Sequence, residues 1–554
     1  MSIHGLWYDQ WIFPPADLKW FASILKEREL TNSSEIENFL YADWQNGLHS
    51  PHLLKDYLLA GERIAEAIRN QEKIMVFGDY DVDGVVGVVV LFSIIQKCGG
   101  KVSYRVPHRQ KDGYGLKSYL IDEMQAAGVN LLITVDNGIT AANEIAYAKS
   151  LGMEVVVVDH HVVPLDLPPA LAIVNHQQND CTYPWPYLCG AALAYKVGIF
   201  LAEQFLSPAE AQNYVYDTLD LVAIATIADV VPLKGENRMI VKGGLEKIRK
   251  NPRPELKALA RLLKIDLSKI DAETIAFQIS PLLNASGRIY NAYTSIQFLL
   301  GKTELAKDLI NMNFQRKEMV KKSILEAELQ TDDQEISIVH SETWHPGIIG
   351  LIAGRMAEKY YRPAIALTRQ DDTYVASARS IKDFDLFKFL NQFRSSFLHF
   401  GGHAQAAGFS IASDKLEALK EKWQTSAAAQ LSHLPNRPSL QISANLGVDD
   451  YKADLFQFLQ QLAPYGAANP LPQLYFGVFD QIDWKAVGMN QEHLTGSVKV
   501  NSNYTFRLIK FNATANLAEI KNWSKFHLVG RLLNRVWQGE SIWQIEITDL
   551  AKAD

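Results

Sequence analysis

The chain has 554 residues, of which 48% are hydrophobic and 21% charged, so it can bury the cores of about three or four domains and is not a disordered protein. Its net charge of −7 gives no general sign of nucleic-acid binding, for which a basic surface would be expected. No apolar run approaches the roughly 18 residues of a membrane span, and the N-terminus shows no signal peptide. The three cysteines form no C-x-x-C pair, so we expect a protein of the reducing cytoplasm with no membrane partner.

The first half of the chain predicts a parallel β-sheet. Residues 1–70 form an N-terminal segment that is rich in aromatic residues and then helical. From residue 71 to 232, short apolar runs alternate with helical stretches, an order typical of βαβ units. The expected strands are 74–77, 102–106, 131–135 and 155–158, and the expected helices are 85–97, 118–127 and 141–151.

Three further regions follow this α/β domain. Residues 233–334 predict a helical connector, interrupted at 280–288, in which 303–330 forms one long helix. Residues 335–432 predict a second, smaller α/β domain, followed by a linker at 431–438. The last region, 439–554, contains short strands such as 505–511 and 541–547 and predicts a small β-barrel.

Polar side chains stand where the expected strands end, and right-handed crossovers place all these ends at one edge of the sheet. They are Asp79, Asp81 and Asp83 after the first strand, Asp136 after the third, His160 and His161 after the fourth, and Asp229 as a further candidate after a later helical stretch. Ionised carboxylates this close repel one another, and a divalent cation with oxygen ligands is the usual remedy.

Two other interpretations of the acidic segment compete with a metal site. It could be an ordinary acid-rich surface turn, or the first half of a calcium-binding loop. A calcium loop requires a bidentate glutamate at its twelfth position, which here is Val90, so that interpretation fails. Two adjacent histidines at a strand end favour a metal site over structural histidines, because neighbours on a strand point to opposite faces until the strand stops.

Carboxylates combined with imidazoles suit manganese, magnesium or zinc, and the majority of oxygen ligands favours manganese or magnesium. A carboxylate such as Asp136 could bridge two ions. Two ions about 4 Å apart activate a water molecule and stabilise an in-line displacement at phosphorus. The residues therefore indicate metal-assisted hydrolysis of a phosphoester or a phosphoanhydride.

Five motifs together resemble the DHH phosphoesterase superfamily. Four belong to its catalytic domain and the fifth is similar to the glycine-rich signature of the DHH-associated domain; they are 79–84, 135–138, 159–161, 228–232 and 401–408. Within the superfamily the chain most resembles the RecJ family of single-stranded-DNA exonucleases. That resemblance rests on three aspartates in the first motif, on loops at 107–116 and 284–288, and on 462–470, which opens a segment similar to the RecJ OB-fold.

The resemblance implies an enzyme that degrades single-stranded DNA from its 5′ end to 5′-mononucleotides with manganese or magnesium, using two ions. It implies that the ions are held by Asp81, Asp83, Asp136, His160, His161 and Asp229. Asp79 would be a ligand or an acid behind the ligands, and His160 could instead orient water or a phosphate oxygen.

The resemblance also implies a substrate site across a cleft from the ions. Its expected residues are Arg109, Tyr114, Arg288, Ser377, Arg379, Gly401, Gly402 and His403. Arginine offers a bidentate contact to phosphate, and glycines let backbone N–H groups approach it, so we expect a pocket for the 5′-phosphate of the strand. The alternatives are a surface arginine at the end of a strand for Arg379 and a structural histidine in a glycine turn for His403.

Two rival functions remain. A DHH phosphoesterase for short oligonucleotides or cyclic dinucleotides would share the motifs, and a catalytically dead scaffold would bind DNA without cutting it. The intact acids and histidines argue against the scaffold. The C-terminal region argues for RecJ, although its 10 basic and 11 acidic residues over 439–554 give it no bulk positive charge. Its large aromatic residues are expected to be mostly core: Trp484, Phe506, Phe511, Trp523, Trp537 and Trp543. We further expect a monomer that could work with a single-strand-binding protein and a helicase.

Overall fold

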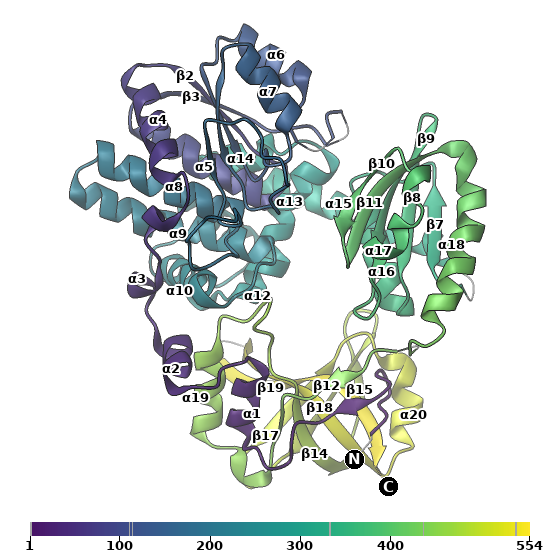
Figure 1. The fold of residues 1–554 in the computed structure, drawn as a ribbon. Coiled ribbons are helices and arrows are strands. Elements are labelled where there is room, and N and C mark those ends of the chain that lie inside the picture. The colour runs from purple at the N-terminus through teal and green to yellow at the C-terminus, as the bar shows by residue number, and fades with distance from the viewer. Residues whose placement is uncertain are drawn as a thin grey trace.

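The computed structural model describes residues 3–109, 111–113, 115–331, 334–435, 437–537 and 540–553. Within them, three bodies surround a central gap between ribbons (Figure 1). The first contains a parallel sheet and the helical connector, the second is the smaller α/β domain, and the third is a β-rich module that also receives the N-terminal segment.

The first body is built on a five-stranded, wholly parallel sheet in the order β3-β2-β4-β5-β6. Its strands are β2 (Lys73–Phe77), β3 (Lys101–Arg105), β4 (Leu131–Val135), β5 (Glu154–Val158) and β6 (Ala172–Val174). The four expected strands are confirmed, and only the three-residue β6 was not predicted. The register places Phe77 beside Thr134 and Val135 beside Val158, so the polar residues that follow these strands meet at one edge.

Helices cover both faces of this sheet. One face packs against α4 (Tyr57–Arg69), α5 (Val82–Lys97), α8 (Gly190–Phe205) and α9 (Pro208–Ala228), in a core that includes Ile74 and Val76. The other face packs against α6 (Ser118–Ala126) and α7 (Ala142–Ser150), through Phe77 and Leu132. The helix α5 is buried along most of its length, which explains why its sequence is apolar on nearly every side. Within the described residues, no helix is both long and apolar enough to cross a membrane.

The connector is helical, as expected. It contains α10 (Gly235–Lys250), α11 (Pro254–Leu263), α12 (Ala272–Thr274), the π-helical turn Ile275–Ile279, α13 (Ser280–Ile289), α14 (Tyr293–Leu299) and α15 (Ala306–Glu328). The predicted interruption at 280–288 is wrong, because this segment is α13 itself. Pro281 follows directly after the π-helical turn Ile275–Ile279 and lies in the first turn of α13, so the helix runs through the proline without a break.

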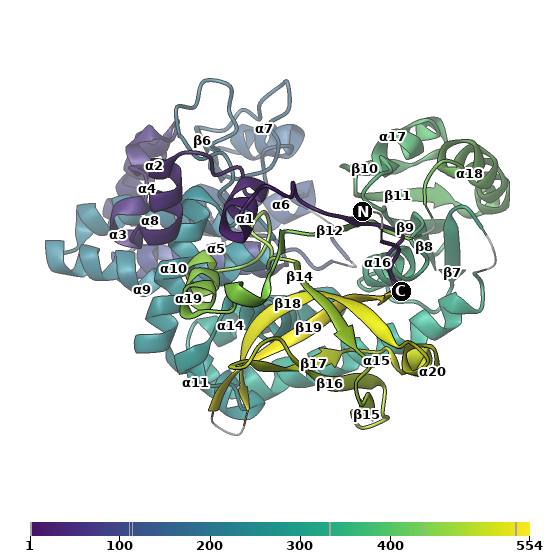
Figure 2. The same cartoon turned by 90° about the horizontal axis from the view of Figure 1, so that it is seen from below.

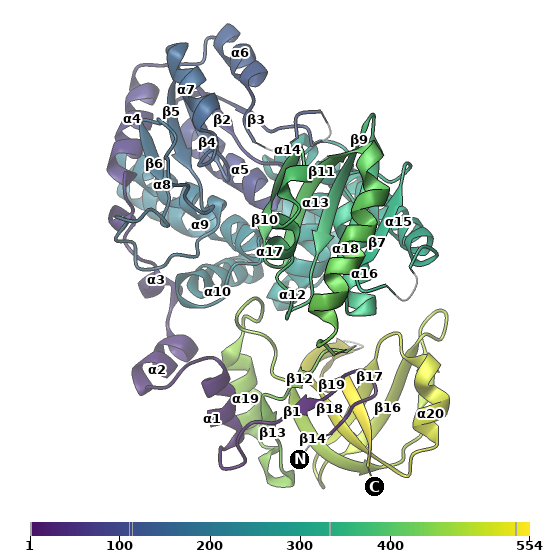
Figure 3. The ribbon, with the colours of Figure 1, turned by 45° about the vertical axis from the view of Figure 1, so that its right-hand side comes forward.

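The second body has a mixed five-stranded sheet in the order β10-β11-β9-β8-β7. Its elements are β7 (Ser337–Ser341), α16 (Ile349–Tyr360), β8 (Ala364–Gln370), β9 (Thr373–Arg379), α17 (Leu386–Asn391), β10 (His399–His403), β11 (Ala406–Ala412) and α18 (Leu416–Leu431). Only the β7–β8 pair is parallel. In Figure 3, α18 lies along the outside of the sheet, whose core includes Trp423.

The third body carries a seven-stranded sheet in the order β13-β14-β18-β19-β17-β16-β15. Its elements are β12 (Leu440–Gln441), β13 (Ala444–Asn445), α19 (Ala453–Leu462), β14 (Leu474–Asp480), β15 (Lys485–Val487), β16 (His493–Lys499), β17 (Thr505–Lys510), α20 (Leu517–Lys521), β18 (Lys525–Trp537) and β19 (Glu540–Ala553). The expected barrel needs a correction: among the described strands, β13 and β15 at the two edges do not pair, so the sheet is OB-like but open.

The large aromatic residues of this module are mostly core, as expected. Trp484, Phe506 and Trp523 are buried. Phe511 is an exception, since 52% of its surface is exposed. Trp543 is half-buried, and the side chain of Trp537 lies outside what the structure describes.

The first part of the N-terminal segment belongs to the third body, although the sequence predicted residues 1–70 as one separate segment. Its elements there are β1 (Trp11–Ile12), α1 (Trp20–Glu27) and α2 (Ser33–Tyr41), whereas α3 (Trp44–Gly47) packs on α10 of the first body. The strand β1 pairs in parallel with β12, and both chain ends lie on this body (Figure 2). Trp11 is buried and its Nε1–H donates to Asp549 Oδ2 at 2.8 Å. A strand pair formed by residues more than 400 positions apart has no local sequence signature.

Candidate metal centre and substrate pocket

The acidic loop after β2 is fixed by its own backbone. Asp81 caps α5, and its Oδ1 accepts hydrogen bonds from the N–H groups of Asp83 at 2.9 Å and Gly84 at 3.2 Å. Gly84 is required here, because a Cβ at this position would lie 2.5 Å from the backbone nitrogen of Asp79. The chain is thus folded tightly enough to bring all three aspartates of the loop to the sheet edge.

Asp83 is buried and oriented by a second helix. Its two carboxylate oxygens accept hydrogen bonds from the first N–H groups of α8, Gly190 at 2.6 Å and Ala191 at 2.8 Å. A helix N-terminus favours a negative charge, so α8 stabilises the ionised carboxylate. A Cβ on Gly190 would lie only 2.8 Å from the Asp136 Cβ. Because glycine has no Cβ, α8 can begin this close to the cluster.

Asp136 follows β4 in a left-handed backbone conformation, with φ 60°. Its N–H donates to Val158 O at 3.0 Å, and its side chain is buried. His160 reaches toward it from the end of β5, with 3.1 Å between His160 Nε2 and Asp136 Oδ1. On its other side, His160 Nδ1 lies 3.8 Å from Asp229 Oδ2. His160 therefore lies between two carboxylates from different elements.

His161 is oriented by Asp159, a residue that the sequence interpretation did not include among the functional ones. Asp159 is buried and its Oδ1 lies 2.7 Å from His161 Nδ1, while its Oδ2 accepts the Ile139 N–H at 3.0 Å. Burial lowers the pKa of His161, but the hydrogen bond and the charge of Asp159 outweigh it and raise the pKa to about 9. A carboxylate behind a metal-binding histidine is a common arrangement, so the position of Asp159 directly before the two histidines was an available signal.

The possible ligand atoms form three sets, and inside each set they lie within 4.8 Å of one another. The sets are Asp136, His160 and His161; Asp83, His160 and Asp229; and Asp79, Asp81 and Asp136. All seven predicted catalytic residues are therefore brought together. Asp136 belongs to two sets, and so does His160. This overlap is the arrangement expected of a carboxylate that bridges two cations.

The electrostatics of the cluster fit a cation. Burial and the neighbouring Asp83 raise the pKa of Asp136 well above its usual value, and burial with Asp83 and Asp81 raises the pKa of Asp229 to about 9. Asp79 Oδ1 and Asp229 Oδ2 are buried, and no described residue donates a hydrogen bond to either. Buried acceptors without donors, surrounded by like charges, are what a divalent ion would satisfy.

The connector supports the metal loop from the other side. Asn284 Oδ1 accepts the Val82 N–H at 3.2 Å. One turn later, a Cβ on Gly287 would lie only 2.0 Å from Tyr80 O, so α13 and the loop are in direct backbone contact. The loop segment 284–288 noted in the sequence is thus a helix that holds the acidic turn in place.

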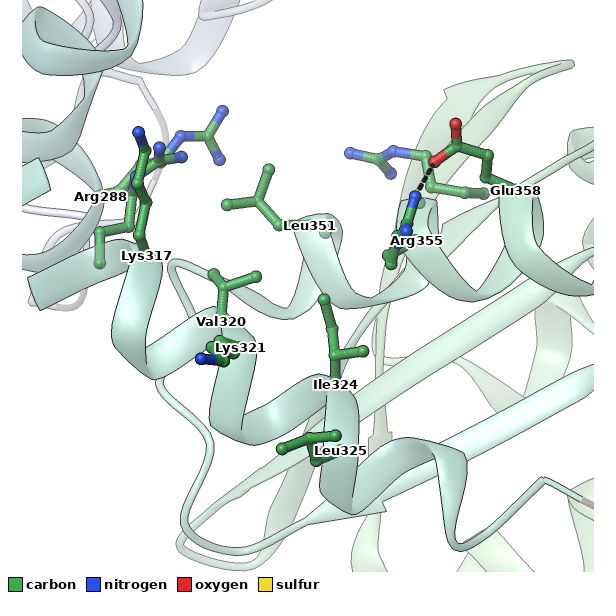
Figure 4. Close-up of a pocket in the computed structure, with 13 residues that line it drawn as sticks. Arg288, Lys317, Val320, Lys321, Ile324, Leu325, Leu351, Arg355 and Glu358 are labelled. Atoms are coloured by element: carbon green, nitrogen blue, oxygen red, sulfur yellow. Dashed lines mark hydrogen bonds and ion pairs between the residues drawn. The ribbon is translucent and has the colours of Figure 1, made fainter. Parts of the chain in front are cut away.

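The predicted substrate residues are only partly brought together. Arg288 and Arg379 line one cavity of about 710 Å³ between α13, α15, α16 and β9 (Figure 4). Ser377 is beside them, since its Oγ accepts a hydrogen bond from Arg379 Nη1 at 3.0 Å. Arg109 does not line this cavity but lies near it, since burial and the charge of Arg109 lower the pKa of both Arg288 and Arg379. Its guanidinium lies 4.9 Å from the centre of the Tyr80 ring. Tyr114 lies outside the described residues.

Gly401, Gly402 and His403 lie on β10, outside the lining of this cavity. The register nevertheless places His403 in one row with Ala406 and Arg379, and Gly401 in one row with Gly408 and Ser377. Paired residues point to the same face, so these side chains share a face with Ser377 and Arg379, about 9–10 Å away across two strand spacings. Gly401 and His403 are exposed on that face.

The cavity also contains basic residues that the sequence did not single out, among them Arg316 and Lys317 of α15. Burial and the nearby Arg109 and Arg316 lower the pKa of Arg288 to about 10, because like charges gather here. Gly350 of α16 leaves room for the pair Ser377 and Arg379, since its Cβ would lie 3.0 Å from Arg379 Nη2. Basic residues on a helix surface usually face solvent, so the sequence gives no reason to place Arg316 and Lys317 in a cavity. Only the packing of α15 against its neighbours shows that they line one.

Comparison with known proteins agrees with this geometry. The family model described as "DHH family, N-terminal domain" matches residues 73–226, "DHHA1 domain" matches 333–428, and "RecJ OB domain" matches 442–549. The single-stranded-DNA-specific exonuclease RecJ of Bacillus subtilis is 34% identical over 544 residues, which cover 96% of this chain and 68% of that protein. RecJ of Haemophilus influenzae is 31% identical over 495 residues, 85% of each chain.

Solved structures give the same result. RecJ of Thermus thermophilus in complex with Mn²⁺ has a TM-score of 0.79 and 25% identity, over 98% of this chain and 80% of that one. An exonuclease RecJ bound to manganese has a TM-score of 0.59 and 29% identity, over 69% and 96% of the two chains. The parallel sheet with its acidic edge and paired histidines is thus the catalytic domain of the DHH class. Within that class, the chain belongs to the RecJ family of single-stranded-DNA-specific exonucleases.

Proposed function

We propose that this chain degrades single-stranded DNA from the 5′ end and releases 5′-mononucleotides in a metal-dependent reaction. The observation that carries the proposal is the overlap of three ligand sets at Asp136 and His160. Two bound ions would activate a water molecule and stabilise the attacking and leaving oxygens at a phosphodiester. The names of the relatives, which specify single-stranded DNA, support the substrate.

The proposed ligands are Asp81, Asp83, Asp136, His160, His161 and Asp229. Manganese or magnesium suits this set because most of its ligand atoms are oxygens. The two oxygens of Asp83 already accept N–H groups of α8, so α8 fixes the direction of this carboxylate. Asp79 reaches the same cluster and is proposed as a ligand or as the acid behind Asp81. His160, between Asp136 and Asp229, is proposed as a ligand or as the group that orients water.

The proposed 5′-phosphate pocket consists of Arg288, Ser377 and Arg379, with the Gly401-Gly402-His403 strand on the same face. Two arginines without a carboxylate within ion-pair distance in the described structure offer strong donors for a dianion. The pKa of Arg288 also responds to Asp81, so the pocket lies near the metal loop. A terminal phosphate held there would leave the first phosphodiester near the ions, which explains the release of single nucleotides. Arg109 and Tyr114 are proposed as further contacts to the strand.

A DHH phosphoesterase for short oligonucleotides or cyclic dinucleotides is the alternative. It would use the same metal centre but has no need of the C-terminal module, which matches the RecJ OB domain. The presence of this module therefore favours the exonuclease. A monomeric state, a cytoplasmic location and the cooperation with a single-strand-binding protein and a helicase remain predictions.

The test uses one oligonucleotide labelled at either end, as a single strand and as a duplex, with manganese. We expect the single strand to be degraded faster than the duplex. The 5′ label should appear at once in a mononucleotide, and the strand that carries the 3′ label should shorten progressively. Loss of the 3′ label first, or equal rates on the duplex, would contradict the proposal.

A further inference from the structure

The cavity that contains Arg288 and Arg379 is much larger than a terminal phosphate requires. Its volume is about 710 Å³, within the range of roughly 300–1,000 Å³ that is usual for small-molecule sites. A phosphate group, comparable with two or three waters of about 30 Å³ each, would fill about a tenth of it. A terminal phosphate alone therefore leaves most of this space open.

The lining is strongly basic. It contains Arg288, Arg316, Lys317, Lys321, Arg355 and Arg379, against one acid, Glu358. Glu358 is engaged by Arg355, with 2.9 Å between Oε2 and Nη1. For Lys317 and Lys321, the described residues supply no carboxylate within ion-pair distance. Such a concentration of uncompensated positive charge is suited to a ligand with several negative charges.

An apolar surface separates the two charged ends of the cavity. Figure 4 shows Val320, Ile324 and Leu325 on α15 and Leu351 between Arg288 and Lys317 on one side and Arg355 with Glu358 on the other. Val320 and Ile324 are four positions apart and so lie on one face of α15. A flat apolar group could rest on this surface while its charged part reaches the arginines.

We propose that this cavity binds a free nucleoside polyphosphate, with its phosphates at the arginines and its base on the apolar surface of Val320, Ile324 and Leu351. Because the phosphates would occupy Arg288 and Arg379, such a nucleotide competes with the 5′-phosphate of a DNA strand. The inference rests on the proposed 5′-phosphate pocket and adds a way of regulating it. The amount of free nucleotide would then set how readily the enzyme engages a strand end.

The test measures binding by calorimetry in EDTA, so that binding to metal ions does not contribute. The probes are ATP, AMP and inorganic tripolyphosphate. The variant Ile324→Trp fills the apolar surface, and Leu329→Trp is the matched control, since Leu329 ends the same helix, is 89% exposed and does not line the cavity. We expect one ATP per chain, bound at least tenfold more tightly than AMP or tripolyphosphate. Ile324→Trp should weaken the binding of ATP at least tenfold and the binding of tripolyphosphate less than twofold. Leu329→Trp should change the binding of neither.

Three outcomes would overturn the inference: no binding of ATP, equal binding of ATP and tripolyphosphate, or the same loss in both tryptophan variants. Equal binding would mean that the cavity recognises phosphates only. A competition assay separates this inference from the proposed function. With manganese in excess over nucleotide, ATP should inhibit hydrolysis of a 5′-phosphorylated strand in wild type and at least tenfold less in Ile324→Trp. If wild type fails to hydrolyse that strand without ATP, the proposed function is wrong, whatever the calorimetry shows.

Discussion

The orientation of His161 depends on one buried carboxylate. Asp159 Oδ1 lies 2.7 Å from His161 Nδ1 and so fixes the orientation of the histidine ring at the sheet edge. Its effect is transmitted through the histidine, so Asp159 is a positioning residue.

We predict that Asp159→Asn raises the manganese concentration needed for half-maximal activity by about 10- to 100-fold, because the histidine loses its charged partner. The measurement is a manganese titration of nuclease rate. Asp180→Asn is the control, since Asp180 is an exposed acid paired with Lys55 at 2.8 Å. An unchanged manganese requirement in a folded Asp159→Asn protein would remove this role from Asp159.

Arg379 is predicted to recognise the phosphate at the end of the strand. Arg379→Ala should lose about 2–3 kcal/mol of a charge-assisted contact, or roughly 30- to 150-fold in binding a 5′-phosphorylated strand. The affinity for a strand with a 5′-hydroxyl should fall much less, because such a strand has no terminal phosphate for Arg379 to contact. Arg369→Ala, on the neighbouring strand β8 and paired with Glu342, should leave both strands unaffected. An equal loss for both ends would make Arg379 a general backbone contact or a structural residue.

Apart from Asp229, which follows helix α9, the acids and histidines of the cluster were predictable from sequence because each follows a strand, and parallel strands bring such positions to one edge. Arg288, Ser377 and Arg379 came from the resemblance, and the structure places Ser377 against Arg379 and both arginines in the lining of one cavity. Arg316 and Lys317 were not predictable. They lie on a long helix whose pattern indicates only an exposed face, and they line a cavity because α13 and α16 pack near it.

At the scale of elements, α13 shows how a local pattern can mislead. The combination of Pro281, Ser286 and Gly287 is typical of a break, yet the helix is continuous through them. The glycine is needed for contact with Tyr80 and not for a turn. Four of the five strands of the sheet, in contrast, could be predicted within one residue, because a buried parallel strand is an apolar run between polar ends; the short β6 was missed.

We predict that Gly287→Ala lowers kcat about 100-fold, since a Cβ 2.0 Å from Tyr80 O must displace either α13 or the metal loop. The steady-state rate in saturating manganese measures this effect. Gly447→Ala is the matched control, because its Cβ would come no closer than 3.4 Å to a neighbouring atom, Asp450 Oδ2. Wild-type activity of Gly287→Ala would show that the loop does not depend on α13.

At the scale of the whole molecule, the linker at 431–438 joins the third body to the second, and the third body also contacts the first directly. Buried Arg238 of α10 donates to Leu462 O at 2.8 Å, to Gln461 O at 2.8 Å and to Phe39 O at 2.9 Å. The linker at 431–438 predicts that a chain cut there keeps the metal chemistry, because every motif acid and histidine lies upstream of the C-terminal module. The structure shows that its removal would leave a buried guanidinium without most of its acceptors.

We therefore predict that a chain ending at Leu434 keeps every proposed metal ligand but is less stable by about 3 kcal/mol or more, since hydrogen bonds to a charged group contribute about 1.5–3 kcal/mol each. Denaturant unfolding followed by tryptophan fluorescence measures the loss. Adding Arg238→Met to the shortened chain should recover part of it, because the unpaired charge is removed. Full stability of the shortened chain would show that the bodies are energetically independent.

We propose above that the acidic sheet edge is a two-ion catalytic centre. Anomalous diffraction from crystals soaked in manganese locates the ions themselves. We expect two manganese peaks about 3.5–4 Å apart, with Asp136 in contact with both and His160, His161 and Asp229 beside them. A single peak, no peak at this edge, or manganese bound elsewhere with Asp136 untouched would contradict it.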